Sequence, residues 1–318
     1  MNARKIAFVL GTFPTASETF IIDQLSYLKN NGFEIDIFSF KKGSLEGVSS
    51  KYLDEDLDHF SNLEIPDSRV VRLIRAVPKI IKTAIFAPGS FLRILRTKEY
   101  RRSLLCLEIF FWVSPFVGKS YDLVHCHFGT TANKFLIIKD ILDKDFRIIT
   151  TFYGRDVSVI VRKYGPGVYS RLKKESKAFI VMSNNMKQRL INIGFEDNKI
   201  YINPPGIDVD SYRFSRKYCK PNERVEIISV GRFVEKKGFD DLLRALTLVK
   251  DRITRPFRCT VVGDGRLRGD ILKLTKELNL EKEVKYTGYM TIENIKNLFN
   301  QMHFFVQPSK TAKNGDME

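Results

Sequence analysis

Short apolar segments alternate with helical patterns along almost the whole chain of 318 residues. A helical crossover between two apolar strands brings them into parallel pairing, with helices covering the sheet. The first series of predicted strands comprises Lys5–Leu10, Glu34–Phe40, Asp122–Phe128, Arg147–Phe152, Lys177–Met182 and Lys199–Asn203. A second series starts at Val225–Val230 and continues through the segments that contain Val261, Tyr286 and Phe305. We therefore predict an α/β protein with two doubly wound parallel sheets.

The segment 206–222 separates the two series, because it mixes Gly, Asp, Ser, Tyr, Arg and Pro without periodicity. We place an interdomain linker there, between a first domain at 1–205 and a second domain at 223–318. Parallel sheets bind ligands beyond the carboxyl ends of their strands. With two such domains facing each other, the site is expected in the cleft between them.

A basic helical insertion is predicted at about 66–118, after a polar and irregular segment at 41–66. The chain carries a formal net charge of +16, and the part from Ser68 to Arg102 has one acid, Glu99, against many cations. Those cations are Arg69, Arg72, Arg75, Lys79, Lys82, Arg93, Arg96, Lys98, Arg101 and Arg102. Interleaved apolar residues suit helices that lie on an anionic membrane. The alternative is a solvated helical face with a buried apolar stripe. Nucleic acid is disfavoured, since no zinc spacing, aromatic stacking set or RNA-binding signature accompanies the charge.

The chain shows no sign of secretion or of a membrane-spanning helix. The apolar run after Lys5 is too short for a signal peptide. The most apolar window, Leu104 to Val117, is interrupted by Glu108 and Pro115. The four cysteines, Cys106, Cys126, Cys219 and Cys259, lack paired spacing and fit reduced thiols. We therefore predict a cytoplasmic protein that associates peripherally with the inner face of the cell membrane.

A strand that turns through glycine into a helix follows the predicted linker. Val225–Val230 leads through Gly231 into an amphipathic helix whose apolar residues are Phe239, Leu242, Leu243, Leu246 and Val249. Such a turn makes an anion cradle, because unpaired backbone N–H groups and the positive end of the helix dipole point into one space. Arg232 and Lys237 add a guanidinium fork and an ammonium, which suit a diphosphate. The alternative is an ordinary strand–helix turn with two solvated cations.

Two histidines lie at the end of the predicted strand Asp122–Phe128. His125 and His127 are two residues apart, so their side chains are predicted to project on the same side of the strand. A buried pair satisfied by the backbone and a role in the cleft both remain open. A metal site is disfavoured, because no third ligand lies nearby in the sequence.

Gly11 ends the first predicted strand, and a glycine there permits close approach of the backbone to a phosphate or a sugar. Thr15-x-x-Glu18 matches a capping box ahead of the first helix. Asp-x-Asp pairs occur at 54/56, 56/58, 143/145 and 208/210. These pairs are predicted to be surface acids in polar turns. Because Arg232 and Lys237 already supply positive charge, no metal or other cofactor is expected.

Taken together, these segments resemble a known family. Gly231-Arg232 to Lys237-Gly238, with Val262-Gly263-Asp264-Gly265, Thr287-Gly288-Tyr289 and Gln307-Pro308-Ser309, resembles the donor-nucleotide domain of family-four retaining glycosyltransferases. The first half looks like the same family, and the stretch Phe13 to Ile21 is similar to the subset that builds exopolysaccharides of the colanic-acid type. The resemblance covers nearly the whole chain. It implies the GT-B fold, in which two Rossmann-like doubly wound domains face a cleft.

The resemblance implies transfer of a sugar, with retention, from a nucleotide-diphosphate donor to a lipid-linked oligosaccharide or exopolysaccharide precursor. Arg232 and Lys237 match the diphosphate-binding element, and His127 matches a histidine beside the donor sugar, where a neutral imidazole can hydrogen-bond a sugar hydroxyl. Glu318 matches the first of two family glutamates and is expected to contact the donor sugar.

Three positions limit what the resemblance implies. The second family glutamate and the closing elements are absent, so the donor domain is expected to be incomplete. A catalytically inactive fragment that binds a membrane or a partner through its basic surface is therefore the alternative function. Tyr153 stands where many members carry histidine, and no role is transferred to it. Asp156 is a candidate for contact with the acceptor or the cleft wall, and equally for a helix N-cap.

Overall fold

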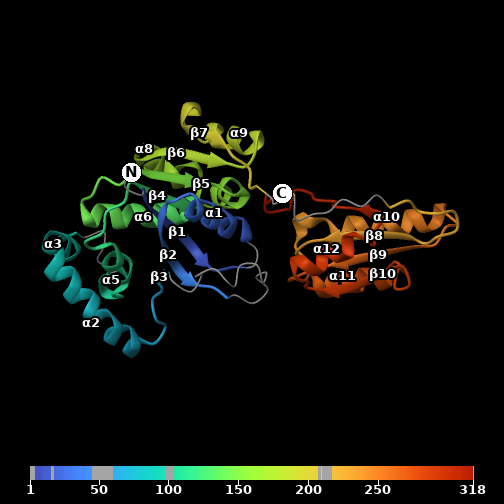
Figure 1. The fold of residues 1–318 in the computed structure, drawn as a ribbon, viewed down its shortest axis with the longest axis horizontal. Helices are drawn as coiled ribbons and strands as arrows, with labels where there is room; N and C mark the ends of the chain where they lie inside the picture. Colours follow the sequence, from blue (N-terminus) through green and yellow to red (C-terminus); the bar gives the residue numbers. More distant parts are fainter. Residues whose placement is uncertain are drawn as a thin grey trace. The chain divides into compact units, whose positions relative to one another are not determined.

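The chain divides into two compact units, of which the first ends at Pro205 and the second begins at Gly206. This computed structural model describes residues 4–15, 18–44, 60–97, 104–206, 209 and 217–317. Most of the predicted linker at 206–222 therefore lies outside the described residues. Figure 1 shows both units, each built on its own parallel sheet with helices packed against it.

A seven-stranded parallel sheet forms the centre of unit 1, in the order β3-β2-β1-β4-β5-β6-β7 (Figure 1). Its strands are β1 (Lys5–Phe13), β2 (Glu34–Lys42), β3 (Ser61–Asn62), β4 (Leu123–His127), β5 (Ile148–Thr151), β6 (Ser176–Val181) and β7 (Ile200–Ile202). The strands after β1 are added on one side of it up to β3 and on its other side from β4 onward, so the direction changes between β1 and β4. This reversal is the switch point at which doubly wound sheets bind their ligands, beyond the carboxyl ends of the strands.

Helices cover both faces of this sheet, and the core between helices and sheet is rich in aromatic residues. They are α1 (Thr19–Asn30), α6 (Gly129–Leu142), α7 (Val159–Tyr164), α8 (Ser170–Glu175) and α9 (Asn184–Asn192). Strand residues alternate between the two faces, so both faces of a parallel sheet need apolar partners. The largest fully buried side chains include Phe8, Phe38, Phe116, Phe135, Phe152, Tyr169 and Phe179.

The predicted basic insertion contains the helices α2 (Arg69–Phe86), α3 (Pro88–Arg96) and α5 (Glu108–Val113). The apolar helix α5 is part of the core, because Ile109, Phe110, Phe111, Trp112 and Val113 are all buried. In contrast, α2 buries only Ala76 and Thr83. Figure 1 shows α2 and α3, in teal, on the outer side of unit 1. No helix among the described residues is long and apolar enough to cross a membrane.

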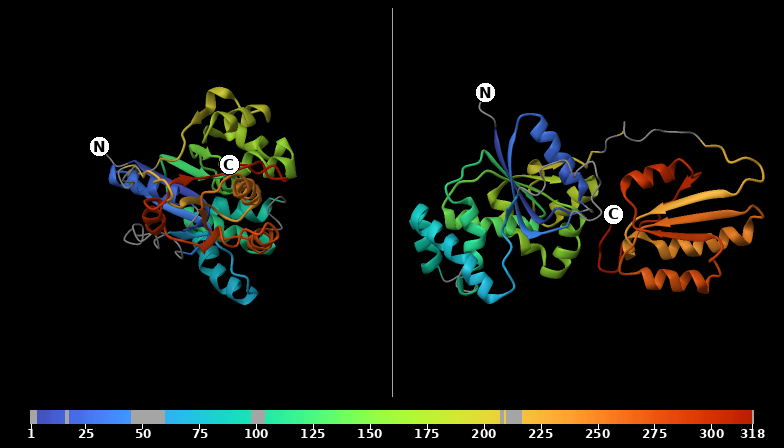
Figure 2. Two further views of the ribbon diagram at one scale, coloured as in Figure 1. Left: turned by 90° about the vertical axis from the view of Figure 1, so that its right-hand side faces the viewer. Right: turned by 60° about the horizontal axis from the view of Figure 1, so that its bottom comes forward.

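Unit 2 has a four-stranded parallel sheet in the order β10-β9-β8-β11. The strands are β8 (Val225–Val230), β9 (Phe257–Val262), β10 (Val284–Gly288) and β11 (Phe304–Phe305), and the helices are α10 (Phe239–Arg252), α11 (Arg268–Glu277) and α12 (Ile292–Phe299). Figure 2 shows α10 and α11 on one face of the sheet and α12 on the other. This order repeats β3-β2-β1-β4 of unit 1, so both units present a switch point beside their first strand.

The predicted strands are confirmed in both units, with ends that differ by a few residues. Three local predictions are wrong. The segment 41–66 contains β3, and the neighbouring Leu63 is fully buried. β1 continues past Gly11 to Phe13. The helix after β1 has Glu18 as its N-cap without a side-chain cap, so Thr15 does not form the predicted capping box.

Candidate active site

Two histidines at the carboxyl end of β4 form the centre of the site in unit 1. The ring centroids of His125 and His127 lie 4.1 Å apart, which confirms that both side chains project on one side of the strand. Phe8 of β1 packs against both rings, at centroid distances of 5.0 and 5.1 Å. Both histidines are buried, and burial lowers the pKa of His125 to about 3. The pair is therefore neutral across the physiological pH range.

His127 has one satisfied and one unsatisfied ring nitrogen. Its Nδ1 lies 2.8 Å from the hydroxyl oxygen of Tyr153, at the start of the loop after β5. Its Nε2 is buried and has no hydrogen-bond partner among the described residues. Burial, and then the neighbouring His125, hold the pKa of His127 well below its usual value. A neutral ring with one unpaired nitrogen can exchange a single hydrogen bond with a ligand oxygen.

Asp156 lies beneath this site and serves a helix terminus. Its carboxylate accepts hydrogen bonds from the backbone N–H groups of Gly129 and Thr130, which begin α6, and from that of Tyr153 at 3.2 Å. The residue is 2% exposed, and burial raises its pKa to about 7. The geometry therefore favours the helix-capping role, and contact with an acceptor stays an untested prediction.

Gly11 lies beside the same helix terminus. It belongs to the part of β1 that runs beyond the paired residues of β4, and a Cβ atom placed on it would lie 3.5 Å from the hydroxyl of Thr131. That separation is ordinary contact, so packing does not require a glycine here. Gly129 differs, because its Cβ would lie 2.5 Å from Cε1 of Phe152 and 2.7 Å from Cε1 of Tyr169. Of these two glycines, packing thus requires the one at the start of α6. Gly43, which follows β2 at the same edge, is also required, because its Cβ would lie 1.9 Å from the carbonyl oxygen of Pro14.

In unit 2, the two predicted diphosphate ligands follow β8. Arg232 is exposed and comes directly after Gly231. Its guanidinium has no hydrogen bond or ion pair with the described part of the chain. Lys237 ends a short 3-10 turn (Glu235–Lys237), and its Cδ would lie 3.3 Å from a Cβ at Gly231. Its aliphatic stem therefore packs over the glycine at the carboxyl end of β8.

Glycines bring three loops together at this edge. A Cβ on Gly263, after β9, would lie 2.0 Å from the carbonyl oxygen of Gly231, and one on Gly238 would lie 1.9 Å from that of Pro308. Both glycines have positive φ, +134° and +66°. Only glycine allows the backbones of β8, β9 and the segment after β11 to approach so closely. The result is an edge formed by backbone, and Arg232 and Lys237 follow β8 at this edge.

The anion cradle differs from the prediction at its helix terminus. The carboxylate of Asp240 accepts hydrogen bonds from the backbone N–H groups of Asp240 and Asp241 in the first turn of α10. Lys310 pairs with both carboxylates, at 2.6 and 2.9 Å. Two acids thus occupy the positive end of the helix, and its N–H groups are not the unpaired donors that the sequence suggested. The diphosphate role of Arg232 and Lys237 stays a prediction.

The chain after β11 returns to the turn that carries Lys237. The backbone N–H of Lys310 donates to the carbonyl of Lys236 at 2.9 Å, and that of Lys313 donates to the carboxylate of Glu235 at 2.9 Å. Asp316 pairs with the ammonium of Lys236 at 3.4 Å. Glu318, the predicted contact of the donor sugar, lies outside the described residues. The residues that precede it therefore pack beside the predicted diphosphate site.

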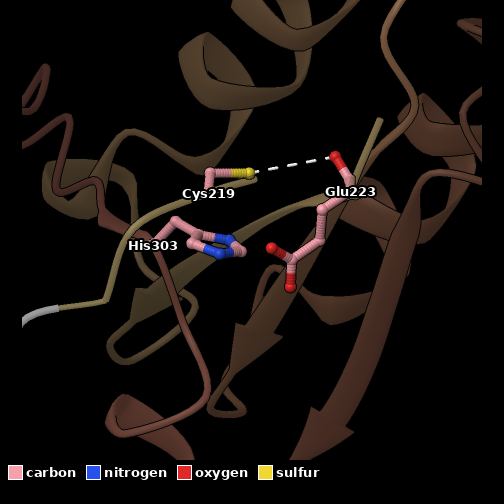
Figure 3. A group of neighbouring side chains, drawn as sticks. All are labelled: Cys219, Glu223 and His303. Carbon is pink, nitrogen blue, oxygen red and sulfur yellow. Dashed lines mark hydrogen bonds between the residues drawn. The ribbon is translucent and has the colours of Figure 1, made fainter. Parts of the chain in front are cut away.

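The described residues contain one group of side chains with mixed metal-ligating atoms, drawn in Figure 3: Cys219, Glu223 and His303. His303 accepts a hydrogen bond at Nδ1 from the backbone N–H of Glu226, so Nε2 carries the proton and cannot bind a cation. A guanidinium nitrogen of Arg255 lies 2.9 Å from the sulfur of Cys219. This donor set does not suit a metal, and it lies at the amino ends of β8 and β11.

One of the four Asp-x-Asp pairs lies within the described residues. Asp143 and Asp145 are exposed, as predicted, and Asp143 pairs with Arg93. The pairs at 54/56, 56/58 and 208/210 lie outside the described residues. Sequence reasoning missed the contact between Tyr153 and His127. The only signal for it was a tyrosine at a position where the resembling family often has histidine.

The two parts of the chain match two family models. Residues 17–211 match the model described as Glycosyltransferase Family 4, and residues 210–315 match the one described as Glycosyl transferases group 1. Among curated proteins, the chain is 27% identical to an amylovoran biosynthesis glycosyltransferase, AmsK, of Erwinia amylovora, over 99% of this chain and 77% of that protein. It is also 27% identical to a putative colanic acid biosynthesis glycosyltransferase, WcaL, of Escherichia coli, with the same coverage.

Solved structures share the fold at low sequence identity. Alr3699/HepE of Anabaena, in complex with UDP-glucose, matches with a TM-score of 0.62 at 16% identity, over 97% of this chain and 74% of that one. Sucrose-phosphate synthase of Thermosynechococcus elongatus matches with a TM-score of 0.65 at 15% identity, over 96% and 75%. Since the first family model spans more than half of its length, this chain belongs to glycosyltransferase family 4, and its two parallel α/β units have the GT-B fold.

Proposed function

We propose that the protein transfers a sugar, with retention, from a nucleotide-diphosphate donor to a lipid-linked oligosaccharide or exopolysaccharide precursor. The observation that carries this proposal is that two cations, Arg232 and Lys237, follow the glycine-packed carboxyl edge of β8, where the stem of Lys237 packs over Gly231. The neighbour that holds UDP-glucose supports a nucleotide sugar as donor. The amylovoran and colanic acid relatives support a polysaccharide precursor as acceptor.

Breaking the bond between the anomeric carbon and the diphosphate places negative charge on the leaving group. Arg232 and Lys237 supply fixed positive charges beside the leaving group, which would stabilise that negative charge. A guanidinium fork and an ammonium neutralise both phosphate groups, which makes a divalent metal unnecessary in this proposal. In unit 1, Nε2 of His127 would hydrogen-bond an oxygen of the transferred sugar and orient the ring.

The donor site is tested by the double change Arg232→Ala and Lys237→Ala. Affinity for nucleotide sugars is measured by calorimetry against a panel that includes UDP-glucose and GDP-mannose. The matched control, Arg244→Ala with Lys285→Ala, removes the same charge from exposed positions of unit 2. We expect at least a hundredfold loss of affinity in the first variant and little change in the second. If nucleotide-sugar affinity survives the first change, the donor-site assignment is wrong.

We further propose that the acceptor is reached from an anionic membrane, through a surface that we call the α2–α3 face. Val70, Ile74, Val77, Ile81 and Ile85 recur every three or four residues, so they share one side of α2. Each is between 46% and 68% exposed. A buried apolar stripe, the alternative considered for this segment, does not match that exposure. The helix therefore presents its apolar side outward.

Cations accompany this exposed stripe. Arg69, Arg75 and Arg96 are exposed, and neither α2 nor α3 contains an acidic residue. Leu92 and Leu95 extend the apolar surface onto α3 and are 46% and 50% exposed. An apolar stripe beside basic residues is typical of helices that insert shallowly among anionic headgroups. A contiguous exposed apolar patch also marks a binding surface in general.

Vesicle sedimentation tests the α2–α3 face. Wild type should bind vesicles that contain phosphatidylglycerol and should release them at high salt, with weak binding to phosphatidylcholine alone. Ile74→Asp with Ile81→Asp should abolish binding, whereas Leu248→Asp, an equally exposed leucine in unit 2, should leave it unchanged. Equal binding of all variants would exclude this surface. Vesicle binding without any nucleotide-sugar binding would favour the inactive, membrane-bound fragment as the function.

A further inference from the structure

We propose that Tyr153 is the positioning residue of His127. Its hydroxyl donates a hydrogen bond to Nδ1, which leaves the ring proton on Nε2 and makes Nε2–H the donor to an oxygen of the transferred sugar. The sugar contact rests on the proposed function. The placement of the proton is a property of the protein alone, and it can be measured without any substrate.

Two contacts hold Tyr153 against His127. The hydroxyl oxygen lies 2.8 Å from Nδ1, and the two rings are parallel within 10° at a centroid distance of 6.0 Å. Phe20 and Phe128 pack on the phenol ring at 5.0 and 4.8 Å. The backbone N–H of Tyr153 is bound by the buried carboxylate of Asp156. Tyr153 is therefore fixed at both its backbone and its ring.

The direction of the hydrogen bond follows from the chemistry of its partners. Burial lowers the pKa of His127 and raises that of Tyr153, so the imidazole is neutral and the phenol keeps its proton. An imine nitrogen is a much better acceptor than a phenol oxygen, whose lone pair is shared with the ring. The O–H group is thus the donor and Nδ1 the acceptor.

A second hydroxyl supports the same direction. Thr151 hydrogen-bonds the hydroxyl of Tyr153, and its Oγ1 also lies 2.7 Å from Nε2 of His125. The four groups can donate in one sequence, from His125 to Thr151 to Tyr153 to His127. Each member then satisfies the next, and hydrogen bonds arranged in such a chain strengthen one another.

This series of hydrogen bonds ends at Nε2 of His127, which has no acceptor among the described residues. A buried donor without an acceptor is costly, so a ligand oxygen at this position gains a well-oriented partner. A sugar hydroxyl provides such an oxygen. If the proton lay on Nδ1 instead, Nε2 would be an acceptor, and it could bind only a ligand oxygen that carries a proton.

Nitrogen-15 NMR of labelled histidine tests the placement of the proton. The protein has four histidines, and His127→Gln assigns the signals of interest. We expect the Nε2–H tautomer in wild type and a mixture of both tautomers in Tyr153→Phe. Tyr169→Phe is the matched control, because it removes another buried hydroxyl, which donates to the backbone carbonyl of Asp156. A wild-type Nδ1–H tautomer, or one unchanged by Tyr153→Phe, would overturn the proposal.

A double-mutant cycle tests the functional consequence. Tyr153→Phe should lower kcat/KM for the nucleotide sugar about tenfold, as expected for one hydrogen bond (about 1.4 kcal/mol). In the His127→Gln background, the same change should have almost no further effect, because Tyr153 acts through His127. Additive losses would show a merely structural role. Absence of transfer by wild type would contradict the proposed function and leave the NMR result valid.

Discussion

The two switch points share a strand order and a glycine packed against backbone, Gly43 in unit 1 and Gly263 in unit 2, and they differ in the side chains around them. At the edge of unit 1, buried neutral rings are linked by side-chain hydrogen bonds around His127. At the edge of unit 2, glycines allow backbone segments to pack closely, and two cations, Arg232 and Lys237, follow the first strand. A low-dielectric, hydrogen-bonded edge suits an uncharged sugar, and a cationic edge suits a diphosphate. One topology thus supports two kinds of recognition, set by the residues that follow the strands.

The largest effect is expected when a methyl group is placed in the backbone-lined edge of unit 2. Gly263→Ala would put Cβ 2.0 Å from the carbonyl oxygen of Gly231, at a φ of +134°. Because backbone cannot move aside, we expect a loss of about 4 kcal/mol or more in unfolding free energy. Denaturant unfolding followed by circular dichroism measures it.

The control for that change is Gly269→Ala, in α11. A Cβ on Gly269 meets nothing within 4 Å, so alanine should stabilise the helix by about 0.5–1 kcal/mol. If Gly263→Ala were as stable as Gly269→Ala, the close packing of the loops after β8 and β9 would be wrong.

Gly129, at the edge of unit 1, should tolerate the same change better than Gly263. Gly129→Ala places Cβ 2.5 Å from Phe152 and 2.7 Å from Tyr169, and both contacts are with side chains that can shift. We expect a loss of about 2–3 kcal/mol, below that of Gly263→Ala. Gly89→Ala in α3 is the control, since its Cβ meets no atom within 4 Å. A larger loss at Gly129 than at Gly263 would reverse the assignment of the rigid edge.

The buried carboxyl group of Asp156 gives unit 1 a pH dependence between about pH 4 and 7, whereas Asp240 at the edge of unit 2 has a lowered pKa and titrates in a more acidic range. Its folded-state pKa of about 7 exceeds the ordinary 3.8, so between these values the folded protein holds a proton that the unfolded chain releases. The stability from Asp156 is complete below about pH 4 and is lost as the pH rises through about 7. Relative to Asp156→Asn, wild type should lose up to about 1.4 kcal/mol per pH unit.

Measuring unfolding free energies of both proteins from pH 4.5 to 7.5 checks this slope. Asp36→Asn is a useful contrast, because hydrogen bonds from Tyr121 and Lys119 outweigh burial and lower the pKa of Asp36. Its stability difference from wild type should stay constant over that range. A difference between wild type and Asp156→Asn that does not change with pH would mean that this carboxyl group is ionised when folded.

The sequence predicted the frame of both edges and missed much of their detail. Apolar runs and glycines placed the strands correctly, because a buried parallel strand needs a continuous apolar segment. The pair of histidines on one side of β4 followed from the two-residue period of a strand. Pairing between elements far apart in sequence was not visible. The contact of Tyr153 with His127 is such a pairing. The two acids in the first turn of α10 were a local signal for an occupied helix terminus, and the prediction of unpaired N–H groups overlooked it.

The α2–α3 face is a second feature that the sequence predicted only in part. Helical period and charge predicted an amphipathic basic segment, and period alone cannot tell whether the apolar stripe faces the core or the solvent. Here α5 supplies the apolar contacts to the core, with five consecutive buried residues, and the stripe of α2 remains exposed. The competition between neighbouring helices for one core surface decides the outcome.

The smallest effect is expected for a change of side-chain shape at the cationic edge of unit 2. Arg232→Lys keeps the charge and removes the planar fork, so affinity for a nucleotide sugar should fall about tenfold, or about 1.4 kcal/mol. The free energy of unfolding should not change, because the guanidinium has no hydrogen bond or ion pair with the described residues. Calorimetric titration and denaturant unfolding of the same sample separate the two quantities. A loss of stability with unchanged affinity would make Arg232 a structural residue, and the diphosphate would then depend on Lys237 alone.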